Sequence, residues 1–141
     1  MKNLFTLLTV LLLSQSLISQ LSLDLEKSKI KWTGKKITNA SHWGSLSFSE
    51  ANLEFDGNDL IGGKFVVDMN TMSVDDIQGR GKQRLEGHLR NEDFFDVNNH
   101  KEAILMFDQR VPLTNGVYEV SGSLTIKGIS KPVKFTLVPD G

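Results

Sequence analysis

Three histidines are the side chains of this chain best suited to bind a metal or move a proton: His42, His88 and His100. A zinc site needs three or four ligands, and compact spacings such as His-Glu-x-x-His place two of them on one helix face. The three histidines match no such spacing, and the chain has no cysteine to complete a set. We therefore predict no metal site. His42 and His88 are expected to donate to buried carbonyl groups or to a ligand head group.

Two aspartates and two serines could also take part in catalysis. Asp93 and Asp96 flank two phenylalanines and could form an acid–base pair, but aspartate is equally favoured in the turn that leaves a helix. Ser121 and Ser123 lack the Gly-x-Ser-x-Gly turn that exposes a nucleophilic serine. No convergent acid–base set is evident, so we predict neither a catalytic residue nor a cofactor. An enzyme acting on a small apolar substrate stays an alternative.

The charges are nearly balanced, with 16 basic and 17 acidic side chains and a net charge of −1. Net charge alone therefore steers the protein toward neither nucleic acid nor an anionic membrane. One basic group, formed by Arg80, Lys82, Arg84 and Arg90, is interpreted as a solvated helix face that could also meet a phosphate head group.

The first residues have the pattern of a secretory signal. Lys2 gives a positive start, Leu4 to Leu13 is almost entirely apolar, and a short polar stretch follows. We predict a signal peptide at residues 1–19, cleaved after Ser19, with an uncleaved anchor as the alternative. Residues 20–141, 122 in number, suffice for one domain with a single core. The mature protein is expected to be periplasmic or secreted, without stable membrane insertion.

Period-two alternation, the pattern of a half-exposed strand, dominates the chain. Asp56 to Asp59 and Asn115-Gly116 have the composition of turns, and another turn is predicted at Lys127–Pro132. The alternating apolar positions fall in six groups: Ile30 and Trp32; Leu46 and Phe48; Leu53 and Phe55; Phe65, Val67 and Met69; Tyr118, Val120, Leu124 and Ile126; and Val133, Phe135 and Leu137.

Two segments break the alternation. From Ser73 to about Arg90 we predict the only substantial helix, opened by Ser73 and Asp76 at capping-box spacing and weakened by three glycines. Ala103 to Phe107 is apolar at every position, which predicts a strand covered on both faces, with the helix as one possible cover.

Short antiparallel strands of this kind build a sandwich or a barrel, and alternation cannot separate the two. The apolar face could fill a dry core or line a cavity. On pattern alone a filled core is favoured, because most apolar faces are core.

Four blocks, in order, point to a known family: Ile30-Lys-Trp32, His42-Trp43-Gly44, Gly87 to Asp96, and Leu124 to Val133. From about Asp24 to Val138 the chain resembles the YceI-like family of secreted, lipocalin-like barrels. The resemblance implies an all-β fold, an antiparallel barrel with one short helical insertion. It also implies an elongated apolar pocket for a long isoprenoid or acyl chain, which shifts the interpretation from filled core to ligand cavity.

The resemblance and the alternation together give a set of predicted ligand-binding residues. The protein is then expected to be a carrier of an isoprenoid or fatty-acyl lipid, with a homodimer left open and a structural envelope protein with a filled core as a further alternative. The predicted set comprises Trp32, His42, Leu46, Phe48, Phe55, Phe65, Val67, Leu89, Phe94, Phe95, Leu105, Tyr118, Val120, Leu124, Ile126 and Phe135.

Two features depart from the family pattern. Asn99-His100-Lys101 stands where the family often has an aromatic residue followed by proline, and the chain ends at Pro139-Asp140-Gly141, where the family continues by a few strands. A closed barrel requires the first and last strands to meet. We therefore expect a C-terminally truncated barrel that lacks its last strands, exposes part of its cavity and associates through its free edges.

Overall fold

Nine elements follow one another in the computed structural model, which describes residues 17–138. Most of the predicted signal peptide and the predicted turn at residues 139–141 lie outside the described residues. In chain order the elements are β1 Ile18–Ser22, β2 Lys29–Lys35, β3 Ser41–Asp56, β4 Asp59–Val74, α1 Gly79–Arg90, β5 Glu102–Pro112, a 3-10 turn at Thr114–Gly116, β6 Tyr118–Ile126 and β7 Ile129–Leu137.

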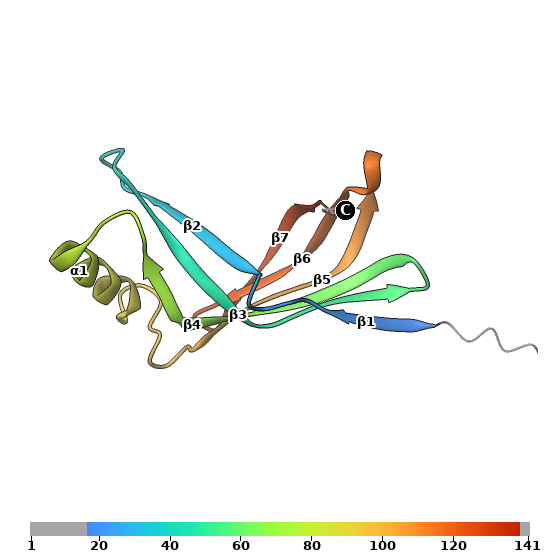
Figure 1. Ribbon diagram of the computed structural model, residues 1–141, viewed down its shortest axis with the longest axis horizontal. Helices are drawn as coiled ribbons and strands as arrows, with labels where there is room; N and C mark the ends of the chain where they lie inside the picture. Colours follow the sequence, from blue (N-terminus) through green and yellow to red (C-terminus); the bar gives the residue numbers. More distant parts are fainter. Residues whose placement is uncertain (1–16, 139–141) are drawn as a thin grey trace, which may run out of the picture.

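The seven strands form one antiparallel sheet in the order β1-β3-β4-β5-β6-β7. β2 pairs with the first half of β3, and β1 pairs with its second half. Figure 1 shows the long β3–β4 hairpin running to one end of the molecule, with the β2–β3 tip and α1 at the other. The mainly antiparallel β fold with one helix is therefore confirmed.

The sheet is open within residues 17–138, because β2 pairs only with β3 and β7 only with β6. Four irregularities in the strand register, three between β3 and β4 and one between β5 and β6, bend and twist the sheet. At two places a Cβ atom would run into the backbone: on Gly44 it would lie 1.8 Å from the carbonyl oxygen of Ser73, and on Gly122 it would lie 1.9 Å from that of Met106.

Three hairpin turns join the strands where turn residues were expected. Gly57, Asn115 and Gly116 all have positive φ, which fits the predicted turns after β3 and β5. The last turn is shorter than predicted. It consists of Lys127 and Gly128 alone, both with positive φ, and β7 begins at Ile129. Pro132 lies within β7, where an edge strand tolerates the missing N–H group.

The helix forms within the predicted span but begins later than the prediction. β4 continues to Val74, which pairs with Gly44 and is fully buried, and α1 starts at Gly79. The capping-box interpretation is wrong, because both polar side chains have other partners. Ser73 donates to the carboxylate of Asp75 at 2.7 Å, and the carboxylate of Asp76 is held by residues of β3.

The strand over Ala103–Phe107 is not covered on both faces. Ala103 and Phe107 are buried, but Met106 is half exposed, and α1 packs mainly against β4. The continuous apolar run misled the prediction because Met106 faces the outer side of the sheet, in register with Lys64 and Ser123.

The predicted cleavage point after Ser19 falls inside β1. Ile18 and Ser19 are in register with Asp56 and Phe55, while Leu17, Ile18 and Leu21 are largely exposed. Cleavage there would remove two of the five register pairs that hold β1 against β3. Within residues 17–138, no helix has the length and apolar character needed to cross a bilayer.

Candidate functional site

One face of the sheet carries most of the predicted ligand-binding residues. Residues in register on adjacent strands share a face. Phe65, Leu105 and Leu124 form one row across β4, β5 and β6. Phe48 and Val67 lie in the next row, on β3 and β4. This side of the sheet is called the apolar face below.

A first apolar cluster lies beneath α1 and the segment that follows it. Its buried members are Met69, Met72, Val97 and Ala103. Five predicted residues pack against them and are only partly buried, namely Leu46, Val67, Leu89, Phe95 and Ile126. The helix and its exit turn therefore cover one end of the apolar face.

A second apolar cluster lies toward the other end of the sheet, around buried Leu60, Phe107 and Val120. The ring centroids of Phe48 and Phe65 are 5.8 Å apart, those of Phe65 and Phe107 are 6.4 Å apart, and those of Phe107 and Phe135 are 5.8 Å apart. Phe55, Tyr118 and Phe135 are the other predicted residues packed against this cluster, with Leu53 and Leu137 beside them.

Between the clusters runs a strip of half-buried apolar side chains. Phe48, Phe65, Leu105 and Leu124 are neither fully buried nor fully exposed, although large apolar side chains are normally among the most buried. The neighbouring aromatic rings give the strip a wide, stiff surface. Such a strip offers apolar contact to a hydrocarbon chain.

Three predicted residues lie outside both clusters and the strip between them. Trp32 donates from its indole nitrogen to the carbonyl of Ser73 at 3.1 Å, which fixes β2 against the end of β4. Phe94 is 46% exposed and stands edge-on to His88, with ring centroids 4.7 Å apart. The structure groups neither Trp32 nor Phe94 with the two clusters.

His42, the third of these, is paired with an aspartate. Its Nδ1 atom lies 2.8 Å from Oδ2 of Asp76, and the backbone N–H of Trp43 donates to the same carboxylate at 3.3 Å. Burial raises the pKa of Asp76, but the hydrogen bonds from His42 and Trp43 outweigh burial and leave this pKa below its usual value. The pair ties the start of β3 to the loop before α1.

The basic side chains of α1 differ in their exposure and in their hydrogen-bond partners. Lys82 Nζ donates to Ser73 Oγ at 3.0 Å and lies 3.6 Å from the carboxylate of Glu86. Arg90 donates to the carbonyl of Met72. Arg80 and Arg84 are exposed. Across residues 17–138, no three histidine or acidic side chains gather in a way that could hold a metal ion.

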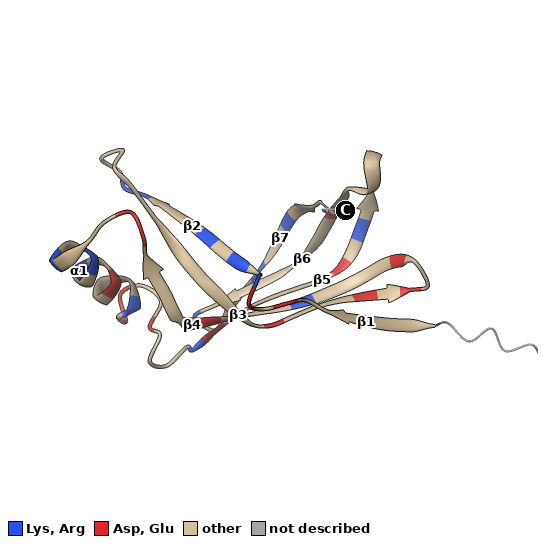
Figure 2. Ribbon diagram, viewed as in Figure 1, with Lys and Arg blue, Asp and Glu red and all other residues tan. Residues whose placement is uncertain are grey.

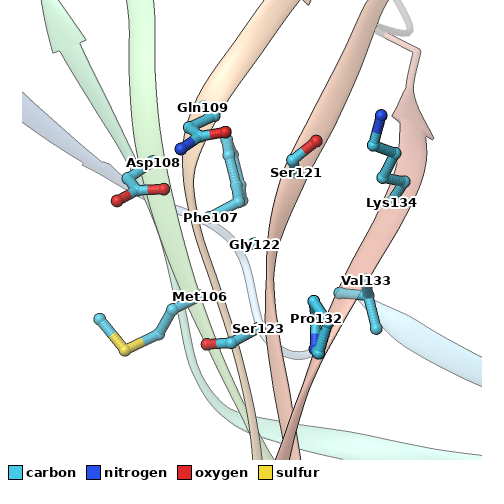
Figure 3. A pocket seen from close by; sticks show the side chains of 10 residues that line it. All are labelled: Met106, Phe107, Asp108, Gln109, Ser121, Gly122, Ser123, Pro132, Val133 and Lys134. Carbon is cyan, nitrogen blue, oxygen red and sulfur yellow. The ribbon is translucent and has the colours of Figure 1, made fainter.

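A hollow lies mainly on the opposite face, although Phe107 also lines it. It has a volume of about 570 Å³ and opens over β5, β6 and β7 (Figure 3). None of the predicted ligand-binding residues lines it. Its lining includes the carboxylate of Asp108, the ammonium of Lys134 and the hydroxyls of Ser121 and Ser123. A hydrocarbon chain there would desolvate the charged groups of Asp108 and Lys134, so the apolar face suits a lipid chain better.

The predicted set omitted residues that the structure places on the apolar face. Phe107 is the clearest, because it joins Phe65 to Phe135. Continuing the alternation from Ala103 through Leu105 would have placed Phe107 on the same face. Leu53, Met69 and Leu137 were assigned to strands by alternation but not to the site, and all three belong to the two clusters.

Comparison with known proteins gives consistent matches. The model of the YceI-like domain matches residues 21–141. A UPF0312 protein of Pectobacterium atrosepticum is 30% identical over 92 residues, covering 65% of this chain and 45% of the relative. A UPF0312 protein of Vibrio parahaemolyticus is 28% identical over 90 residues, covering 64% of this chain and 46% of the relative. The matched region thus spans about half the length of these relatives.

A solved structure has a similar fold. The crystal structure of BcnA from Burkholderia cenocepacia superposes with a TM-score of 0.66 and 24% sequence identity, covering 84% of this chain and 72% of that chain. At this identity the likeness concerns the fold alone.

Proposed function

This chain belongs to the YceI-like family, and we propose that it is a binding protein for a long-chain isoprenoid or acyl lipid. The lipid chain would lie along the apolar face, which in this proposal is the inner wall of a lipocalin-like barrel. The ligand-binding residues proposed are the sixteen predicted from sequence, together with Phe107.

One observation carries the proposal: the half-buried strip formed by Phe48, Phe65, Leu105 and Leu124 between two apolar clusters. Each methylene group moved from water to such a surface contributes about 0.8 kcal/mol. A chain of a dozen methylene groups would therefore gain about 10 kcal/mol before the costs of ordering it. Polar contacts are needed only at the head group.

The end of the strip near α1 is the best place for the head group to bind. The exposed side chains of Arg80 and Arg84 supply positive charge there, while Lys82 and Arg90 are held by other partners. An anionic or strongly polar head group fits this charge. The predicted leader at residues 1–19 supports export, and we propose a periplasmic or secreted location.

The test is lipid extraction from the protein purified under native conditions, followed by mass spectrometry. A long-chain lipid that co-purifies in a fixed ratio to protein supports the proposal. A fluorescent prenyl or acyl probe should bind to delipidated protein and be displaced by the extracted lipid. Failure of every apolar probe to bind would contradict the proposal and favour a structural envelope protein with a filled core.

An enzyme in the same cavity is a second candidate, and the half-buried pair of His42 and Asp76 is the observation that favours it. Such a pair can orient a histidine as a general base. Turnover of an ester or isoprenoid substrate that is lost in His42→Gln would support the enzyme. Stoichiometric binding without turnover supports the carrier.

A further inference from the structure

The β2–β3 tip presents an apolar side chain on an ordered turn. Ile37 is fully exposed, with a relative accessibility of 105%. The turn beneath it is closed by two backbone hydrogen bonds, from Lys36 to the carbonyl of Ala40 at 2.8 Å and from Asn39 to the carbonyl of Lys36 at 3.0 Å. Ile37 is therefore held out in solvent by a formed turn. An isolated exposed isoleucine needs no explanation by itself, but its surroundings are unusual.

Basic residues surround this side chain without any acidic neighbour in sequence. Residues 29–44 contain four lysines, Lys29, Lys31, Lys35 and Lys36, and no aspartate or glutamate. Farther along the same segment, Trp43 is 41% exposed, and Lys31 Nζ lies 4.5 Å from the centre of its ring. Aromatic and basic side chains in this combination suit the interface of an anionic bilayer.

The helix brings two exposed arginines to the same end, beside acidic residues of its own and of the loop before it. Asp75 donates its backbone N–H to the carbonyl of Trp43 at 3.0 Å, and Asp76 is paired with His42, so the start of β3 is tied to the loop before α1. Figure 1 shows α1 and the β2–β3 tip together at this end of the molecule. The exposed side chains of Arg80 and Arg84 follow that loop.

The opposite end of the molecule is acidic. The tip of the β3–β4 hairpin carries Glu54, Asp56 and Asp59, all exposed. Figure 2 shows blue along β2 and red at the β3–β4 tip, while α1 and the loop before it carry both colours. The two hairpin tips thus differ in charge, basic at β2–β3 and acidic at β3–β4, and this difference favours the β2–β3 tip facing an anionic surface.

We propose that the β2–β3 tip docks on an anionic lipid surface, with Lys35 and Lys36 at the head groups and Ile37 inserted between them. Docking in this orientation brings the α1 end of the apolar face to the membrane, where a lipid could be loaded or released. That consequence rests on the function proposed above, whereas docking itself does not. The binding is reversible, because a few basic residues and one aliphatic side chain give only modest membrane affinity.

The test is co-sedimentation of the full chain with large vesicles made of equal parts phosphatidylcholine and phosphatidylglycerol, with vesicles of phosphatidylcholine alone beside them. Binding is expected only to the anionic vesicles and is expected to weaken with salt. Each basic residue near such a surface is worth about fivefold in partition. Lys35→Gln with Lys36→Gln should therefore lower partition by about 25-fold. Ile37→Ser should lower it by several-fold at every salt concentration.

The matched control is Lys27→Gln with Lys134→Gln, two exposed lysines before β2 and on β7, which makes the same change in net charge away from the tip. This variant should bind anionic vesicles nearly as well as the parent chain. Equal loss in the control and the tip variant, or equal binding to neutral vesicles, would overturn the proposal. Uptake of a fluorescent acyl probe from vesicle-free solution should be unchanged in the tip variants, which separates a failure of docking from a failure of lipid binding.

Discussion

At the scale of single residues, the two faces of β6 give a direct test of the proposed binding face. Leu124 lies on the apolar face in register with Leu105, and Ser123 points to the opposite face in register with Met106. A carboxylate facing hydrocarbon without a partner is strongly unfavourable. Leu124→Glu is therefore expected to lower the affinity for an acyl or prenyl probe at least tenfold, about 1.4 kcal/mol.

The matched control is Ser123→Glu, which adds the same charge one residue away. It should leave probe affinity within about twofold of the parent, a change of less than 1 kcal/mol. Phe48→Glu repeats the test on β3. Both apolar-face variants need a folding check by circular dichroism. A folded Leu124→Glu protein that retains full uptake would remove Leu124 from the site.

The pairing of His42 with Asp76 predicts a pH dependence of stability. The pKa of Asp76 is lowered in the folded state, because hydrogen bonds from His42 and Trp43 outweigh the effect of burial. The stabilisation by Asp76 is therefore fully present above the ordinary aspartate pKa, about 3.9, and is lost as the pH falls through the lower folded value. The difference in melting temperature between the parent and Asp76→Asn should shrink below about pH 4.

Asp93→Asn serves as the control, because Asp93 is exposed in the turn after α1. Its melting temperature should follow that of the parent at every pH. A difference between the parent and Asp76→Asn that stays constant from neutral pH to pH values well below the ordinary aspartate pKa would show that the carboxylate charge contributes nothing to stability.

At the scale of elements, glycine plays opposite roles in α1 and in β6. Gly87 lies inside the helix, and a Cβ atom there would meet nothing within 4 Å. Glycine weakens a helix interior by about 1 kcal/mol relative to alanine, so Gly87→Ala should raise the free energy of unfolding by about that amount. Urea denaturation measures the change, and a loss of stability would mean that Gly87 has a contact not seen in the structure.

Gly122 is expected to behave in the opposite way. A Cβ atom there would lie 1.9 Å from the carbonyl oxygen of Met106 and 2.7 Å from the Cα atom of Phe107, both backbone atoms that cannot move aside easily. Gly122→Ala should therefore lower the free energy of unfolding by about 3 kcal/mol or prevent folding. A neutral result would mean that β5 and β6 separate at this point without cost.

The elements also show how far the sequence predicts the structure. Alternation located the strands because period-two burial is a local property, and Asn115-Gly116 located a hairpin turn for the same reason. It did not show that two alternating runs, around Phe48 and around Phe55, belong to the single strand β3, because bulges break the period. It also placed the start of the helix too early, since the partners of Ser73 and Asp76 are set by tertiary contacts.

At the scale of the whole molecule, the sequence predicts which residues lie on the apolar face better than it predicts which of them are buried by other parts of the chain. Val120 and Phe135 were assigned to the set, and the structure packs both against the second cluster. Which apolar residues stay half exposed depends on sheet curvature and on what covers the strip, and neither is a local property. The opposite charges of the two hairpin tips were also hidden from the sequence, because the sum of charges carries no positions.

The open sheet leads to a last prediction, on association. Within residues 17–138, the edges of β2 and β7 have one strand partner each, and the strip on the apolar face is half exposed, so both backbone pairing and apolar contact favour association. The same edges also carry residues that oppose association between molecules. These are Lys29 and Lys31 on β2 and Lys131, Pro132 and Lys134 on β7.

Because repulsion between lysines is screened by salt and apolar contact is not, the balance should shift with ionic strength. In sedimentation velocity, the 141-residue chain is expected to associate more strongly at high salt than at low salt. Lys131→Gln with Lys134→Gln should associate already at low salt. A saturating acyl lipid should reduce association, because it covers the apolar strip. A chain that stays monomeric at every salt and protein concentration while it folds cooperatively and binds lipid would mean that the apolar strip is covered within one molecule.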